Sequence, residues 1–324
     1  MRTRSFTLAV SLFLPLSSAF AVPVNTINQL FFFGDSLSDS GNASIATLGA
    51  EPGSGGYYYR SVSGLPYQVG EFTNAPVAGG PTGVWADQFA SKLGLPVAQP
   101  FLAGGTNFAI ASAMTGSNGL DGVTDQLGYF ASAVGSTAPS NALYAFWAGA
   151  NDVGNGSNPI TAADNLYQNI LTLSAKGAKT FLWFNLPDLG KTPDALAAGP
   201  VQSGLASAAS NAFDNEWALD LSRLQSQGID VMGVDVASEF LAIEADPAAF
   251  GFINVTTPAI SVPGANPNQY LFFDGEHPTA ATDALIADLA FTDLVAAPEP
   301  AAIALAGLGI LLVLLLGRSA RRET

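Results

Sequence analysis

Short apolar runs alternate along this chain with longer stretches whose apolar residues recur at helical spacing. The short runs predict buried strands at 30–33, 107–111, 142–148, 179–185 and 229–234. The longer stretches predict helices over 85–93, 121–133, 161–176, 201–227, 237–244 and 279–291. Repeated alternation of this kind predicts an α/β fold, in which a doubly wound parallel sheet is the middle of three layers and helices cover both of its faces.

Two long connections interrupt this alternation. Residues 43–82 are rich in glycine, proline and tyrosine and lack a helical period, so they are expected to form a surface loop. The tyrosines of this loop either line an acyl or sugar pocket or pin the loop to the body of the domain. The second connection, 246–273, ends just before the segment that contains the chain's only histidine.

Both ends of the chain have patterns of their own. Arg2 and Arg4, the apolar run 6–16 and a small-residue site at 19–21 predict a secretory signal peptide over residues 1–21, because the run is short for an N-terminal membrane anchor. At the other end an uncharged run, 301–317, follows Pro-Glu-Pro at 298–300. It precedes a cluster of arginines, namely Arg318, Arg321 and Arg322. This pattern predicts a membrane helix with a cytoplasmic end and makes a buried core helix the weaker alternative.

The predicted organisation is therefore a signal peptide at 1–21, one domain at 22–297 and a tail at 298–324. The 324-residue chain has a net charge of −15, which argues against nucleic acid or an anionic membrane surface as a partner. It has no cysteine and one histidine, so disulfides and thiolate or histidine-rich metal sites are excluded. No cofactor is expected; a calcium site made only of carboxylates stays open, without EF-hand spacing to support it.

The candidate chemistry lies where predicted strands end. Ser36 follows the first strand directly, at the edge where open α/β sheets place their ligands. The single histidine, His277, follows Asp274 by three residues, so one turn can carry a base and the carboxylate that orients it. The order is Ser, Asp, His, but no Gly-x-Ser-x-Gly occurs, which indicates a scaffold other than the α/β-hydrolases. A lone serine at such a turn is more often a helix cap.

Several blocks together resemble the GDSL, or SGNH, esterases and lipases. They occur in order at 33–42, 72–76 with 84–90 and 93–95, 104–113, 147–152, 185–193 and 274–277. The resemblance implies a flavodoxin-like fold, a catalytic set of Ser36, Asp274 and His277, and an oxyanion hole formed by the backbone N–H groups of Ser36 and Ser112 and the amide of Asn151. Ser112 stands where the family has a glycine. Taken alone, Asn151 reads as a turn residue.

The resemblance implies a serine hydrolase that cleaves carboxylic esters through an acyl-enzyme, and the predicted signal peptide implies that it is exported. Acyl lipids, small esters and O-acetylated polysaccharides are the expected substrates. The alternative is a surface-anchored matrix or binding protein that keeps the fold with little or no activity. The tail resembles a PEP-CTERM sorting signal, which implies an exosortase-type processing enzyme as a partner. The domain would be anchored in the inner membrane by the C-terminal helix, facing the periplasm, and after processing would reach the cell surface or medium.

Overall fold

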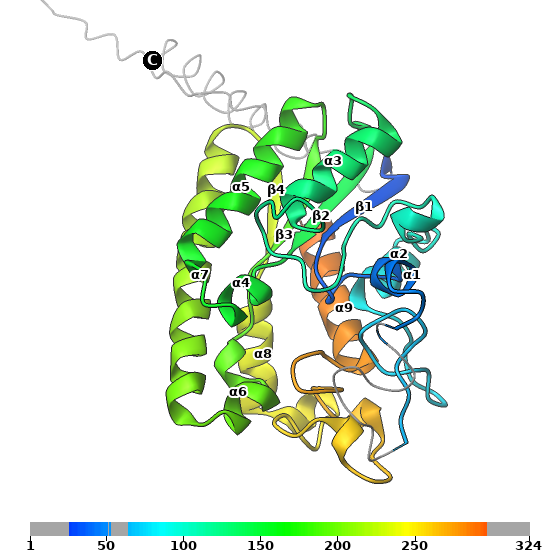
Figure 1. Ribbon diagram of the computed structural model, residues 1–324, viewed down its shortest axis with the longest axis vertical. Coiled ribbons are helices and arrows are strands. Elements are labelled where there is room, and N and C mark those ends of the chain that lie inside the picture. Colours follow the sequence, from blue (N-terminus) through cyan, green and yellow to red (C-terminus); the bar gives the residue numbers. More distant parts are fainter. Residues whose placement is uncertain (1–25, 51, 53–63, 297–324) are drawn as a thin grey trace, which may run out of the picture.

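A parallel β-sheet forms the middle layer of the protein, with helices on both faces (Figure 1). The computed structural model describes residues 26–50, 52 and 64–296. The predicted signal peptide, the predicted membrane tail and the tyrosines at 57–59 lie outside these residues. The predicted α/β fold with a parallel sheet is confirmed.

The sheet has four strands in the order β1-β2-β3-β4, and all neighbours are parallel. The strands are β1 (Gln29–Gly34), β2 (Ala142–Trp147), β3 (Thr180–Phe184) and β4 (Asp230–Val234). Residues 106–110 run alongside the free edge of β1: Phe108 N donates to Phe32 O over 2.8 Å and Ile110 N donates to Gly34 O over 3.1 Å. Counted with this segment, the spatial order is the 2-1-3-4-5 of flavodoxin-like sheets, whose ligands bind where the order reverses. That point lies between β1 and β2.

Helices form the two outer layers. The longer ones are α2 (Trp85–Lys92), α3 (Val123–Val134), α5 (Pro159–Ala175), α7 (Pro200–Ser226), α8 (Val236–Ala245) and α9 (Ala280–Ala296). Short helices of five residues are α1 (Asn42–Ala46), α4 (Ala150–Gly154) and α6 (Pro193–Ala197). Single 3-10 turns are η2 (Phe101–Ala103), η3 (Leu189–Lys191), η4 (Pro247–Phe250), η5 (Ala259–Ser261) and η6 (Pro267–Gln269).

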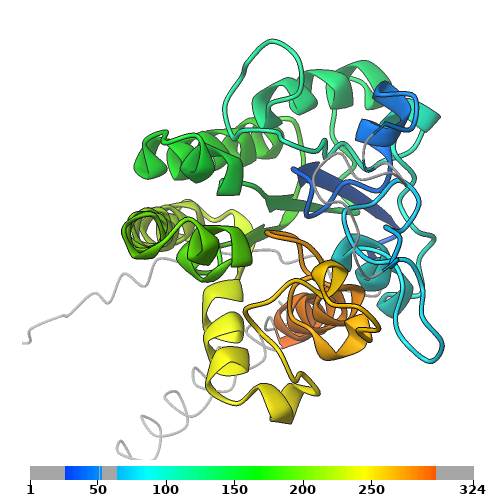
Figure 2. The same cartoon turned by 60° about the horizontal axis from the view of Figure 1, so that its bottom comes forward.

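The strands are apolar throughout because both faces of the sheet are covered. In β1, Leu30 and Phe32 point into a core shared with α2, α8 and α9, whereas Phe31 and Phe33 point into a core shared with α3, α5 and α7. Figure 2 shows this division, with α3 and α5 on one side of the sheet and α2 and α9 on the other. The sheet therefore holds the ends of β1 and β2 rigidly between two packed layers.

Some predicted elements need correction. The strand predicted at 107–111 is wrong: only isolated bridges form there, because the side chain of Asn107 turns back to accept a hydrogen bond from Ala109 N. Helix α5 begins at Pro159 and not at Thr161, since Asn158 Oδ1 caps the N–H groups of Ile160 and Thr161. None of the helices within the described residues is both long and apolar enough to cross a membrane.

Candidate active site

Ser36 lies on the turn that leaves the C-terminal end of β1. At this end the strands approach so closely that a Cβ on Gly34 would lie 2.1 Å from Trp147 O of β2. Gln126 of α3 fixes the same residue from the other side, since its Oε1 accepts from Gly34 N and its Nε2 donates to Gly34 O. Only glycine fits at position 34, and these contacts hold Gly34, from which the turn with Ser36 begins, in one position.

The turn is also tied to the 107–111 segment through polar side chains. Asp39 accepts hydrogen bonds from the backbone N–H groups of 41, 42 and 43 and from Ala111 N. Asn42 Nδ2 donates to the carbonyls of Asn107 and Ala109, and Asn107 Nδ2 donates to Ser38 O. The Ser-x-Ser-Asp-Ser-Gly-Asn block at 36–42 is therefore explained mostly by positioning: it holds Ser36 against the segment that leads to Ser112.

Ser36, His277 and Asp274 form a continuous chain of contacts although Ser36 and His277 are 241 positions apart. His277 Nε2 lies 2.8 Å from Ser36 Oγ, and His277 Nδ1 lies 2.7 Å from Asp274 Oδ2. Asp274 Oδ1 also accepts from the backbone N–H of His277 and of Glu276, which locks the Asp-x-x-His turn. A neutral imidazole that donates from Nδ1 leaves Nε2 as an acceptor for the serine hydroxyl proton.

Tyr67 extends this chain by one more residue, which the sequence analysis did not identify. Its hydroxyl donates to Asp274 Oδ2 over 2.7 Å, so that oxygen is shared between Tyr67 and His277. The Tyr67 ring packs edge-on against Phe273. The tyrosine belongs to the loop 43–82, and its place in that loop gave no sequence signal that pointed to Asp274.

The electrostatics of the site favour an imidazolium next to a carboxylate. Burial is the largest influence on His277 and opposes its charged form, but the carboxylate of Asp274, with Glu276 and Asp35, outweighs it and raises the pKa of His277 to about 9. Burial also opposes the charge of Asp274, yet His277 and the backbone donors lower the pKa of Asp274. Burial raises the pKa of Asp35, whose Oδ1 accepts from Leu37 N, to about 7.

Asn151 follows β2, and Ser112 follows the segment 106–110. Both β2 and this segment are neighbours of β1, whose end carries Ser36. Asn151, in the first turn of α4, donates one Nδ2 hydrogen to Ala113 O over 3.1 Å, and an amide nitrogen carries a second hydrogen. Ser112 has φ +65°, in the left-handed region that favours glycine, and its side chain is exposed. Asp152 accepts from Thr115 N and Oγ1 and so ties the end of this segment to α4.

A cavity of about 530 Å³ opens next to the Ser36–His277 pair. Its polar end contains Ser36, His277 and Asn151, which places the nucleophile candidate and the amide in one space. Its other walls come from α4, η3, α6, α7 and α8 and combine apolar side chains with polar ones such as Asp188, Thr192 and Gln202. The apolar lining residues include Val153, Leu189, Leu205, Ala206, Ala209, Phe240 and Phe272. Ser112 is not among the lining residues.

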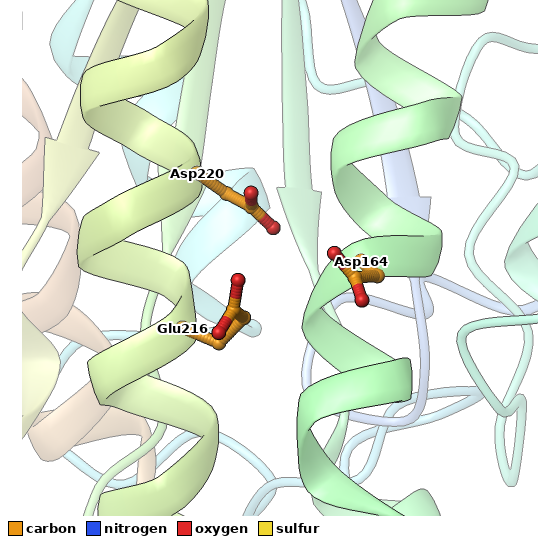
Figure 3. A group of neighbouring side chains, drawn as sticks. All are labelled: Asp164, Glu216 and Asp220. Carbon is orange, nitrogen blue, oxygen red and sulfur yellow. The ribbon is translucent and has the colours of Figure 1, made fainter.

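Within the described residues, one group of acidic side chains has ligand atoms close enough together to hold a metal ion (Figure 3). Asp164 of α5 faces Glu216 and Asp220 of α7, and their ligand atoms lie within 4.8 Å of one another. Arg223 Nη1 already pairs with both acids of α7, at 3.0 Å from Glu216 and 2.5 Å from Asp220. None of the three acidic residues lines the cavity with Ser36.

Comparison with known proteins adds a family. A family model described as GDSL-like lipase/acylhydrolase matches residues 30–290. That range contains the turn with Ser36, the Asp274–His277 pair and all the residues that line the cavity.

Three curated relatives illustrate the match. The chain is 31% identical over 321 residues to an uncharacterized protein in the trpE-trpG intergenic region of Pseudomonas putida, covering 89% of this chain and 52% of the relative. It is 30% identical over 233 residues to the phosphatidylcholine-sterol acyltransferase of Aeromonas hydrophila, covering 69% and 63%. It is 28% identical over 332 residues to esterase EstA of Pseudomonas aeruginosa, covering 90% and 50%. The chain thus spans about half to two thirds of these relatives.

One solved structure has a weaker likeness. The carbohydrate acetylesterase Est24 of Sinorhizobium meliloti aligns with a TM-score of 0.42 and 16% identity, over 87% of this chain and 99% of that chain. A likeness at this level indicates nothing about the substrate.

Proposed function

This chain belongs to the GDSL-like lipase/acylhydrolase family, and from that membership we propose that it is a serine hydrolase that cleaves carboxylic esters through an acyl-enzyme. One observation carries the proposal: Ser36 Oγ, His277 and Asp274 are joined by contacts of 2.8 and 2.7 Å at the end of a cavity. A serine hydroxyl needs such a base to become a nucleophile, and the base needs a group that orients it.

In the proposed acylation step, Ser36 Oγ attacks the ester carbonyl carbon while its proton passes to His277 Nε2. Asp274 stabilises the imidazolium that forms, as the raised pKa of His277 indicates. The tetrahedral intermediate then collapses, the bond to the alcohol oxygen breaks, and His277 Nε2 gives its proton to that oxygen. In deacylation a water oxygen attacks the acyl carbon while one of its protons passes to His277 Nε2. The bond between the acyl carbon and Ser36 Oγ then breaks, His277 Nε2 returns the proton to Ser36 Oγ, and the carboxylic acid leaves.

We assign the oxyanion of the intermediate to three donors: the backbone N–H groups of Ser36 and Ser112 and the second Nδ2 hydrogen of Asn151. Asn151 lines the cavity beside Ser36, which supports its part. Preorganised donors of this kind are often the largest contribution to acyl-transfer catalysis. Ser112 retains a backbone N–H despite its side chain, and its φ of +65° shows that the segment accommodates a serine there.

Among the expected substrates, the cavity favours esters whose acyl part is an apolar chain. Its walls beyond Ser36 are built from aliphatic and aromatic side chains such as Leu205, Phe240 and Phe272, which lower the free energy of a bound hydrocarbon chain by removing it from water. A non-catalytic binding role gains no support, because the contacts of Ser36, His277 and Asp274 are complete.

Turnover of nitrophenyl esters of increasing acyl length by the full chain tests the proposal. We expect hydrolysis by the wild-type protein and a loss of several orders of magnitude in Ser36→Ala and in His277→Ala, since nucleophile and base act as a unit. Folding of both variants is checked by circular dichroism. Near-wild-type turnover by a folded Ser36→Ala protein would remove Ser36 from the mechanism.

We further propose that the protein is exported, held in the inner membrane by residues 301–317 and processed near Pro298-Glu299-Pro300. The support is the sequence pattern of both ends, including Arg318, Arg321 and Arg322, which are costly to move through hydrocarbon. Truncation before Pro298 is expected to release a soluble protein from the membrane fraction. A full-length protein that is freely soluble, or a domain protected from protease on the cytoplasmic side, would contradict the proposal.

A further inference from the structure

The segment from α6 into α7 differs in charge from the rest of this acidic protein. No charged residue occurs between Asp194 and Asp214, although the chain as a whole has 26 acidic and 11 basic residues. This uncharged stretch forms the end of α6 and the first half of α7. Figure 1 shows α6 beside the lower end of α7, at the lower left of the molecule.

The same stretch exposes large apolar side chains. Leu196 of α6 is 39% exposed, and Val201 and Leu205 of α7 are 71% and 60% exposed. Val201, Leu205 and Ala208 are four and three residues apart, a spacing that places them on one face of the helix, and Ala208 is exposed as well. We call Leu196, Val201, Leu205 and Ala208 the apolar ridge.

The apolar ridge is continuous with the cavity that contains Ser36. Leu205 belongs to both, and its neighbours Gln202, Ala206 and Ala209 on α7 line the cavity. Helix α7 therefore presents one face to solvent and an adjacent face to the cavity. The part of α7 that joins the ridge to the cavity has no charged residue, so an apolar chain at the ridge lies next to an uncharged wall of the cavity.

We propose that the apolar ridge docks the protein on a neutral or zwitterionic lipid surface and so delivers ester substrates to the cavity. The proposal rests on the proposed ester hydrolysis. Exposed apolar patches of soluble proteins commonly mark interaction sites, and a ridge without charges fits a lipid layer. The net charge of −15 disfavours an anionic lipid surface, and Lys191, at the border of the stretch, faces Glu244 at 3.9 Å.

A kinetic comparison in the full chain tests the ridge through two side chains that do not line the cavity. In the double variant Leu196→Ser/Val201→Ser, hydrolysis of tributyrin below its solubility limit should match that of the wild-type protein. Above that limit, where droplets form, the rate at low droplet area should fall about tenfold, because two apolar contacts with the droplet are lost. The control Leu120→Ser/Ile253→Ser changes apolar residues of 72% and 69% exposure that lie outside α6 and α7, and it should behave as wild type in both regimes.

Binding is measured separately in the Ser36→Ala background, so that it does not depend on turnover. The Ser36→Ala protein should bind vesicles of dioleoylphosphatidylcholine with about tenfold higher affinity than the form that also has the two ridge substitutions. Both forms should bind vesicles of the anionic lipid dioleoylphosphatidylglycerol more weakly, because the protein is itself negatively charged. Because the proposed membrane helix at 301–317 would itself bind vesicles, each form is also compared after truncation before Pro298, where the differences report the ridge. Equal vesicle binding by ridge and control variants would overturn the proposal, as would a dimer in sedimentation that the ridge substitutions dissociate. If the wild-type protein does not hydrolyse tributyrin at all, the result contradicts the proposed function and not the ridge.

Discussion

The activity of this protein should rise steeply with pH through the neutral range. The mechanism needs neutral His277 as the base, and Asp274, Glu276 and Asp35 raise its pKa to about 9 against the opposing effect of burial. A group with this pKa is about 1% neutral at pH 7 and about half neutral at pH 9, so kcat/KM should increase roughly 50-fold between these values. Because the charged form is the inactive one, the acid limb must have its midpoint above 6.5, the ordinary value for histidine.

The assay is kcat/KM for a soluble nitrophenyl ester at closely spaced pH values, with the rate of Ser36→Ala subtracted at each pH to remove background hydrolysis. Return of samples from pH 9 to pH 7 before assay checks that the enzyme is not denatured. Glu276→Gln removes one of the carboxylates that raise the pKa of His277, so its midpoint should lie lower than that of the wild-type protein. A wild-type midpoint at or below 6.5 would show that these carboxylates do not raise the pKa of His277, and an upward shift in Glu276→Gln would contradict the part given to Glu276.

Three further substitutions separate the roles of the surrounding residues. Asn151→Ala should lower kcat by roughly 10²–10³ with little change in KM, the usual loss for one oxyanion donor; an effect on KM alone would assign Asn151 to substrate binding. Ser112→Gly should raise the free energy of unfolding by about 1 kcal/mol in chemical denaturation, because φ is +65°, and should keep or raise kcat; a large fall in kcat would mean that the hydroxyl contributes. Tyr67→Phe removes the donor to Asp274 Oδ2 and should lower kcat about tenfold at constant KM, as measured by steady-state kinetics. Unchanged kcat in a less stable Tyr67→Phe protein would limit Tyr67 to a structural part.

The central elements of the fold followed from the sequence because their patterns are local. The apolar runs at 142–148 and 179–185 are typical of strands that are buried on both faces, and the structure has β2 and β3 there. Ser36 and His277 could be paired from the sequence because the chain has only one histidine. The structure brings them to 2.8 Å.

Other features depend on contacts between distant segments and left no local pattern. The contact of Tyr67 with Asp274 joins residues 207 positions apart, so neither neighbourhood reveals it. The segment near Asn107 has the composition of a strand, but the Asn107 side chain accepts from Ala109 N and donates to Ser38 O, and only isolated bridges form there. The cavity is assembled from β2, from several helices and from the turns that carry Ser36 and His277, so no single stretch of sequence encodes its walls.

The most direct test of the account is the site of covalent modification by a fluorophosphonate, which forms a stable ester with an activated serine. The proposed mechanism predicts one adduct per chain, which peptide mass spectrometry should locate on Ser36. Labelling should be lost in His277→Ala, because no base then activates the Ser36 hydroxyl. Labelling of the wild-type protein on another serine, or undiminished labelling of Ser36 in folded His277→Ala, would contradict it.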